Sequence, residues 1–108
     1  MTKRGDVKRL LWELKEALES IYGEDFRGLY LYGSYARGEE DPESDLDVII
    51  VLKDFEDYWE EVERTGQVIA QLALKYGVSL SPVRVREREW LRRDTPFLAQ
   101  VHRECVPV

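Results

Sequence analysis

Apolar residues recur at helical spacing in the first part of the chain. Between residues 6 and 22 they fall every three or four positions, which predicts an amphipathic helix with one buried face. The members of this stripe are Val7, Leu10, Leu11, Leu14, Ala17, Leu18 and Ile21. Asp6 is suited to the N-cap of the helix, and Gly23 is suited to its end.

Two β-strands are predicted after this helix. Residues 29–32 are rich in β-favouring side chains and end at Gly33. Residues 46–52 are apolar throughout except for Asp47, which is typical of a strand buried on both faces at the centre of a sheet. The intervening residues 34–44 are polar and rich in turn formers, so they predict a loop with room for one helical turn.

A second long helix is predicted to begin after the central strand. Asp54 is a candidate N-cap, and Gly77 is a candidate C-terminal stop. Gly66 weakens the helix by up to about 1 kcal/mol relative to alanine, so a break there is one alternative. The expected apolar stripe consists of Phe55, Trp59, Val62, Ile69, Ala73 and Tyr76.

A third strand and a last helix complete the pattern. Residues 78–86 alternate in polarity, and Pro82 favours an edge position or a bulge because proline cannot donate to a β-ladder. Thr95 and Pro96 predict an N-cap and a first turn for a helix that extends to about Glu104. The predicted fold class is α/β, a small mixed β-sheet flanked by helices. A length of 108 residues suits a single domain over residues 1–108.

Composition and charge exclude several classes of protein. No apolar run approaches the roughly 20 residues needed to span a bilayer, and residues 1–6 do not resemble a signal peptide. We therefore expect a cytoplasmic protein without a membrane partner. The net charge of −6 argues against direct binding to a nucleic-acid backbone, which requires basic surface.

The candidate chemistry lies where the loop meets the central strand. Asp45 and Asp47 are one residue apart at the start of that strand, so their Cα atoms are roughly 6.6 Å apart and their side chains share a face. Two carboxylates in this arrangement suit Mg²⁺, whose remaining positions stay open for water and phosphate oxygens. An aspartate inside an apolar strand is costly unless it is paired or metal-bound, which makes Asp47 the more informative of the two.

A phosphate-binding turn is predicted just before the carboxylates. Gly33 permits close approach of a ligand to the backbone, and the Ser34 hydroxyl and neighbouring N–H groups suit a phosphate. Arg37 is positioned to add a charged hydrogen bond. Each feature is common alone, but their conjunction indicates metal-assisted chemistry on a nucleotide.

Gly33-Ser34, ten residues and then Asp45-x-Asp47 resemble the signature of the DNA polymerase β-type nucleotidyltransferase superfamily, and the chain length resembles its minimal branch. Less specific similarity extends to residues 76–83 and 96–101. The resemblance implies a polymerase β-like fold and transfer of a nucleoside monophosphate, usually AMP from Mg²⁺-ATP, to a hydroxyl with release of pyrophosphate.

The resemblance also implies a partner. Members of the minimal branch are often encoded beside a HEPN-domain protein and resemble antitoxins of a HEPN ribonuclease, in some cases by adenylylating one of its tyrosines. We therefore expect ATP or another NTP as ligand and a HEPN-type toxin as acceptor, with a homodimer as a further alternative for assembly.

The sequence departs from the superfamily in one respect. Many members carry a third carboxylate on the strand after the aspartate pair, where this chain has Ser79 and Ser81. Glu87 and Glu89 lie beyond that strand and are weak substitutes. Three functions therefore remain in competition. The first is an adenylyltransferase antitoxin that modifies its partner, and the second is a nucleotide-binding antitoxin subunit with little or no turnover that acts by docking. The third is a structural subunit that delivers nucleotide or substrate to a separate catalytic protein.

Several conspicuous side chains have an ordinary structural interpretation. Arg84, Arg86 and Arg88 alternate and favour a solvated strand edge over a triphosphate site. A surface position is expected for His102 rather than a general base. The tryptophans, at positions 12, 59 and 90, are expected in the core or an interface, and an exposed one would mark a partner surface.

Overall fold

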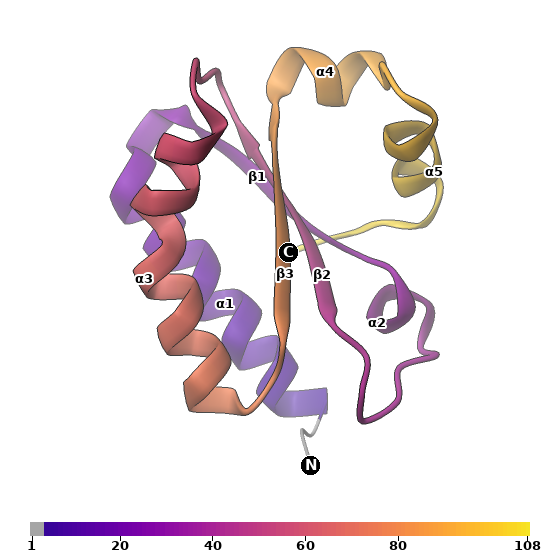
Figure 1. Ribbon diagram of the computed structural model, residues 1–108. Coiled ribbons are helices and arrows are strands. Elements are labelled where there is room, and N and C mark those ends of the chain that lie inside the picture. The colour runs from indigo at the N-terminus through magenta and orange to yellow at the C-terminus, as the bar shows by residue number, and fades with distance from the viewer. Residues whose placement is uncertain (1–3) are drawn as a thin grey trace.

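The computed structural model describes residues 4–108 of the chain. Within them one sheet has the strand order β3-β2-β1-β4, and helices cover both of its faces (Figure 1). Residues 1–3 lie outside the described residues. They belong to the predicted domain over residues 1–108 and to residues 1–6, which were not expected to form a signal peptide. In the part of the chain that is described, no helix is both long and apolar enough to cross a membrane.

The elements follow the order that the sequence predicts, with additions between and after them. They are α1 (Arg4–Tyr22), the 3₁₀-helix η1 (Gly23–Asp25), β1 (Phe26–Tyr32), α2 (Ser34–Arg37), β2 (Leu46–Leu52), α3 (Tyr58–Tyr76), β3 (Leu80–Arg86), α4 (Glu87–Arg92), α5 (Pro96–Glu104) and β4 (Val106–Pro107). The sequence pattern did not indicate η1, α4 or β4. The fold is α/β with a small mixed sheet flanked by helices, as predicted.

The central strand β2 organises the core. It pairs antiparallel with β1 and parallel with β3, and all of its residues except Asp47 are buried. Side chains that alternate along β2 enter two separate apolar clusters. One cluster combines Leu46, Val48, Ile50 and Leu52 with the leucines of α1, and the other combines Ile49 and Val51 with Trp90, Leu98 and Val101. Consequently α1 and α3 cover one face of the sheet, while α4 and α5 cover the other (Figure 1).

The first helix and strand are longer than predicted. α1 ends at Tyr22 as expected but begins at Arg4, so Asp6 lies inside its first turn and the predicted N-cap is wrong. There the carboxylate interacts favourably with the helix dipole without capping. β1 begins at Phe26 because the ladder with β2 reaches from the pair Tyr32–Asp47 back to the pair Phe26–Leu52, with a shift in register between Phe26 and Gly28.

The second long helix begins later than predicted. Asp57 is its N-cap, and its Oδ1 accepts a 2.9 Å hydrogen bond from the N–H of Trp59. The prediction of Asp54 is wrong: its Oδ1 accepts hydrogen bonds from the Phe55 N–H and from Arg86 Nε. The helix continues through Gly66 without a break.

The apolar stripe predicted for this helix is also wrong in part. Phe55 precedes the helix, and Trp59 is 72% exposed. The buried residues of α3 are instead Glu61, Thr65 and Leu72. The helix ends at Gly77, as predicted, with a left-handed φ of 64°.

The last elements largely match expectation. β3 is an edge strand that contains Pro82, and Thr95 Oγ1 caps α5 by accepting the N–H of Leu98. The expected solvated arginine edge is wrong, because Arg84 is 7% exposed and Arg88 lies in α4 rather than in the strand.

Candidate functional site

The end of β1 and the start of β2 bring the Gly33 turn against Asp47. Tyr32 is the register partner of Asp47, so the residue after Tyr32 lies beside that aspartate. Gly33 has φ 77° and ψ −156°, and a Cβ added to it would collide with the Asp47 carboxylate. Glycine is therefore required on two grounds, backbone conformation and space. The predicted turn and the predicted strand aspartate are in direct contact.

Ser34 opens the single-turn helix α2 directly after this glycine. The Gly33 carbonyl accepts the N–H groups of Ala36 and Arg37 at 3.1 and 3.2 Å, which closes the turn. The first N–H groups of a helix have no partner within it, so those of Ser34 and Tyr35 are available to a ligand. This turn can present backbone donors and a hydroxyl beside Asp47.

Asp45 and Asp47 project from the sheet toward the α4–α5 side. This follows from alternation, because Leu46 and Val48 enter the opposite apolar cluster. Asp45 is exposed and Asp47 is half-buried. Burial and the neighbouring Asp45 carboxylate both raise the pKa of Asp47, and the Arg37 guanidinium partly offsets them. The pair thus concentrates negative charge that a bound cation would stabilise.

Arg37 is held close to this pair by two other carboxylates. Its Nε donates to Glu39 Oε1 at 3.1 Å, and its Nη1 donates to Glu104 Oε1 at 3.2 Å. Glu104 comes from the end of α5, more than sixty residues away in the sequence. A phosphate group entering the site would compete with these carboxylates for the guanidinium. No sequence pattern indicated Glu104, since its approach to Arg37 depends on how α5 packs.

A serine lies beside the aspartate pair on β3, the strand on which the resemblance leads us to expect a third carboxylate. Ser81 is the register partner of Asp47 across the parallel β2–β3 ladder. Among the described residues no group of three or more His, Cys, Asp or Glu side chains is arranged to hold a metal ion. Glu89 accepts the Arg86 N–H at the far end of β3, and Glu87 also lies there, so neither substitutes for the missing carboxylate.

Aromatic side chains line the sheet beside the carboxylates. Burial, with a smaller contribution from the Asp47 charge, raises the pKa of Tyr32 to about 12, so its hydroxyl stays protonated at neutral pH. Its ring meets Phe97 of α5 edge-on at 5.6 Å. Tyr30 packs on Trp90, and the ring of His102 stacks on Trp90 at 3.8 Å with Nε2 2.6 Å from the Trp90 carbonyl oxygen. His102 is therefore half-buried and structural.

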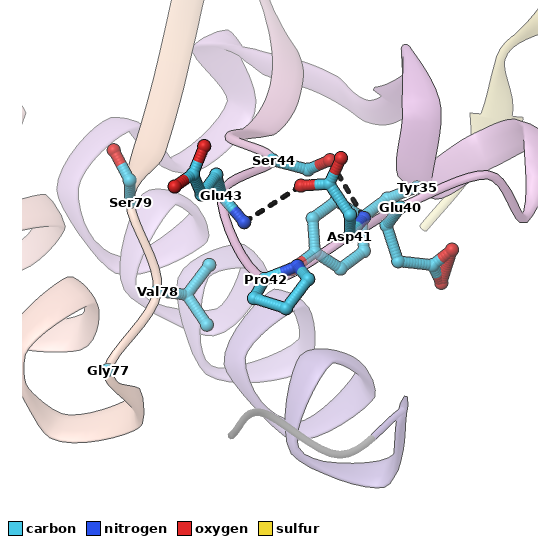
Figure 2. Close-up of a pocket in the computed structure, with 9 residues that line it drawn as sticks. All are labelled: Tyr35, Glu40, Asp41, Pro42, Glu43, Ser44, Gly77, Val78 and Ser79. Carbon is cyan, nitrogen blue, oxygen red and sulfur yellow. Dashed lines mark hydrogen bonds between the residues drawn. The ribbon is translucent and has the colours of Figure 1, made fainter.

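A cavity of about 620 Å³ lies at the same end of the sheet but does not include the aspartate pair (Figure 2). It is bounded by the loop 40–44 and by residues 77–79. Tyr35 and Val78 on its wall belong to the apolar cluster of α1, so it opens on the face opposite to Asp47. The loop is held by Asp41 Oδ1, which accepts the Glu43 N–H at 2.8 Å.

The fold is that of a nucleotidyltransferase domain. The family profile described as "Nucleotidyltransferase domain" matches residues 11–104. The chain belongs to this family, which confirms the predicted class of enzyme and the resemblance on which the prediction rested.

Two similar proteins come from Methanocaldococcus jannaschii. The "Putative protein adenylyltransferase MJ0141" is 31% identical over 78 residues, which cover 72% of this chain and 78% of the relative. The "Putative protein adenylyltransferase MJ0604" is 34% identical over 76 residues, which cover 70% of each chain.

Solved structures share the fold at lower identity. A chain described as "Structure of putative minimal nucleotidyltransferase" has a TM-score of 0.60 and 22% identity, with 94% of both chains covered. A toxin–antitoxin with AMP-PNP has a TM-score of 0.59 and 21% identity, covering 88% of this chain and 69% of the other. A tri-AMPylated Shewanella oneidensis HEPN toxin in complex with MNT antitoxin has a TM-score of 0.57 and 16% identity, covering 93% of this chain and 69% of the other.

The donor set at Asp45 and Asp47 fits a magnesium ion. Mg²⁺ is commonly held by one or two carboxylates together with substrate phosphates, and it keeps several waters. One half-buried and one exposed carboxylate at the start of β2 meet that requirement. Burial and the Asp45 charge raise the pKa of Asp47, and a bound cation would offset the charge of the pair. Magnesium and the roles of these residues remain predictions.

Proposed function

We propose that the chain transfers a nucleoside monophosphate, AMP from ATP, to a hydroxyl of a HEPN-type toxin and thereby acts as its antitoxin. The observation that carries the proposal is the contact between Gly33 and the carboxylate of Asp47, which joins a phosphate-binding turn to a carboxylate pair. The relatives named as protein adenylyltransferases and the AMPylated toxin complex among the structural neighbours support it.

The reaction would form a bond between the acceptor oxygen and the α-phosphorus while the bond from the α-phosphorus to the bridging oxygen breaks. Pyrophosphate leaves, and the hydroxyl proton passes to solvent. Asp45 and Asp47 would hold Mg²⁺, which supplies positive charge to the phosphates when bound. The Ser34 hydroxyl and the first N–H groups of α2 would bind the terminal phosphates, and Arg37 would add a charged hydrogen bond. Catalysis would then rest on positioning and charge stabilisation.

A second candidate is a nucleotide-binding antitoxin that neutralises its partner by docking alone. Ser81 favours it, because this serine stands opposite Asp47 where many members have a carboxylate. No side chain at this position can then take up the acceptor proton or add to the metal site. The two candidates share ligand and partner and differ only in turnover.

The deciding experiment combines the chain with a HEPN-type protein from the same organism, Mg²⁺ and ATP labelled at the α-phosphate. Intact-mass spectrometry then measures the gain of AMP units on the partner. The paired substitutions Asp45→Asn and Asp47→Asn should abolish labelling. A matched control, Asp41→Asn with Glu43→Gln, removes two exposed carboxylates from the adjacent loop and should retain it.

Each result separates the candidates. Labelling that persists in the Asp45→Asn and Asp47→Asn variant contradicts the assigned site. A wild-type chain that binds and neutralises the partner without adding AMP establishes the docking function. Replacing ATP by GTP, CTP or UTP in the same assay identifies the nucleotide.

A further inference from the structure

The loop before α3 and the first turns of this helix form a surface with exposed aromatic side chains that are not packed into the core. Trp59 is 72% exposed and Tyr58 is 37% exposed. Around them the sequence is strongly acidic, since residues 54–63 contain six carboxylates and neither lysine nor arginine. We define the α3 surface as Glu56, Tyr58, Trp59, Glu60 and Glu63.

Only some of these carboxylates have a structural role. Asp54 pairs with Arg86, and Asp57 caps α3. Glu61 is buried, and its Oε1 accepts a 2.7 Å hydrogen bond from the Tyr22 hydroxyl. The other three, Glu56, Glu60 and Glu63, are exposed and make no ion pair with any described residue.

Interaction with the helix dipole accounts for Glu60 alone. Glu60 lies in the first turn of α3, whereas Glu56 precedes the helix and Glu63 lies beyond that turn. Glu63 is four residues after Trp59, so the two side chains share a helix face. Glu56 and Glu63 therefore add exposed negative charge to this surface without stabilising the helix.

The Tyr58 ring of the α3 surface is held in place. The Tyr58 hydroxyl accepts the N–H of Arg84 at 3.3 Å, which ties this ring to β3. Trp59 meets Tyr58 edge-on, with ring centroids 6.4 Å apart, and Tyr58 in turn meets Phe55 at 6.0 Å. A fixed aromatic side chain loses little conformational freedom on binding, and tryptophan and tyrosine are enriched among the residues that dominate interface energies.

We propose that the α3 surface docks a basic, lysine- or arginine-rich surface of a protein partner. Charge decides between the possible occupants. A nucleic acid or an anionic membrane would be repelled by Glu56, Glu60 and Glu63. A second copy of the chain would bring the same unpaired carboxylates together across a symmetric contact. A basic protein surface gives each of them a partner and covers Trp59.

The location separates this surface from the candidate site. α3 begins just after the end of β2, whereas Asp45 and Asp47 lie at its start, and a strand of seven residues spans about 20 Å. Figure 1 shows the start of α3 and the α2 loop at opposite ends of the sheet. Docking and nucleotide chemistry should therefore be separable by substitution, and the proposal does not depend on AMP transfer.

The first test is photo-crosslinking in the native host. The photoreactive residue p-benzoylphenylalanine replaces Trp59 in one strain and Trp12, which is 58% exposed on α1, in a matched control strain. The expected product is an adduct at position 59, stronger than at position 12, whose crosslinked peptide carries net positive charge. An adduct with a second copy, with nucleic acid or with an acidic peptide overturns the proposal, as does the absence of an adduct at position 59.

The second test measures affinity for the crosslinked partner with purified proteins by calorimetry at low and high salt. Trp59→Ala and the pair Glu56→Lys with Glu63→Lys should each weaken binding about tenfold or more. Glu56→Gln with Glu63→Gln should have an intermediate effect, and the control Trp12→Ala should change affinity less than about twofold. Thermal unfolding verifies that these exposed substitutions leave the fold intact. Equal losses for Trp12→Ala and Trp59→Ala, or binding insensitive to salt and to charge reversal, overturn the proposal.

Discussion

Gly33 combines a backbone conformation that side chains disfavour with a Cα that faces the carboxylate of Asp47. Replacing it with alanine forces either the turn or the aspartate to move. We expect Gly33→Ala to lower the free energy of unfolding by roughly 1–3 kcal/mol and to weaken nucleotide binding. Urea unfolding and calorimetric titration with ATP measure the two effects.

A matched control for this substitution is Gly66→Ala. Gly66 lies within α3, and a Cβ there would meet nothing within 4 Å. Alanine is favoured over glycine inside a helix by roughly 0.5–1 kcal/mol, so this variant should be more stable than the wild type and bind nucleotide equally well. If both alanine variants behave alike, the contact between Gly33 and Asp47 is not what requires glycine.

The raised pKa of Asp47 has a consequence for stability. Because the folded state keeps the proton to higher pH than the unfolded state, the free energy of unfolding falls as pH rises from the ordinary value near 3.8 through the raised pKa. Above this window the charged Asp47 destabilises the free protein. We therefore expect Asp47→Asn to raise the Tm at pH 7 and the difference to vanish below the ordinary pKa.

Melting curves at several pH values, with and without Mg²⁺ and ATP, check this prediction. Ligand should stabilise the wild type and leave Asp47→Asn unchanged. Glu43→Gln removes another carboxylate from the neighbouring loop and serves as the control. A lower Tm for Asp47→Asn at pH 7 without ligand would show that the aspartate stabilises the free protein.

The residues of the candidate site were predictable only where they are close in sequence. Gly33, Ser34 and the pair Asp45 and Asp47 lie within fifteen residues, so a turn followed by a buried strand is enough to bring them together. Glu104 and Phe97 approach the same region from α5, through packing that no local pattern specifies.

At the scale of elements, capping determines where α3 begins. The Asp57 side chain accepts the N–H of Trp59, whereas Asp54 interacts with Arg86. We expect Asp57→Ala to lower the free energy of unfolding by about 0.5–2 kcal/mol, because the helix loses its N-cap. Asp54→Ala removes one exposed ion pair and should cost less, up to about 1 kcal/mol. Urea unfolding of both variants tests the order, and a larger loss for Asp54→Ala would contradict it.

A buried polar contact joins α3 to β3. Arg84 is 7% exposed, and its Nη2 donates to Thr65 Oγ1 at 2.6 Å, while its Nε has no hydrogen-bond partner among the described residues. Thr65→Val removes the acceptor and leaves a second guanidinium nitrogen buried without this partner. We expect it to cost about 1–3 kcal/mol.

A double-mutant cycle with Arg84→Met tests this contact. Methionine removes the buried charge, so Thr65→Val should cost much less in the Arg84→Met background than in the wild type. Equal costs in the two backgrounds, measured by urea unfolding, would show that Thr65 and Arg84 do not interact.

The elements differ in how far local sequence determines them. The boundaries of β2 were predictable because its run of residues, apolar except for Asp47, has sharp ends. The start of α3 was not, since Asp54 and Asp57 are equally good caps until the pairing of Asp54 with Arg86 selects between them. α4 has only six residues, most of them charged, and β4 has two, so neither produces a periodic signal. Burial of Arg84 likewise depends on α3 lying over β3.

At the scale of the whole molecule, the sheet separates the candidate site, the cavity and the α3 surface. The end of the sheet where β2 begins carries Asp45 and Asp47 on the α4–α5 side and the cavity on the opposite face. Its other end carries the α3 surface. The order of elements along the chain made the class of fold predictable, whereas the exposure of Trp59 depends on the rotation of α3, which only packing decides.

This separation predicts that substitutions at the two ends act independently. Asp47→Asn and Trp59→Ala affect side chains with no shared partner, at opposite ends of a strand that spans about 20 Å. Their effects on the free energy of unfolding should therefore add within about 0.5 kcal/mol in the double variant. Urea unfolding of the two single variants and the double variant measures the difference. A coupling above about 1 kcal/mol would mean that the ends communicate through the sheet, in which case docking at α3 would also change nucleotide affinity by the same factor.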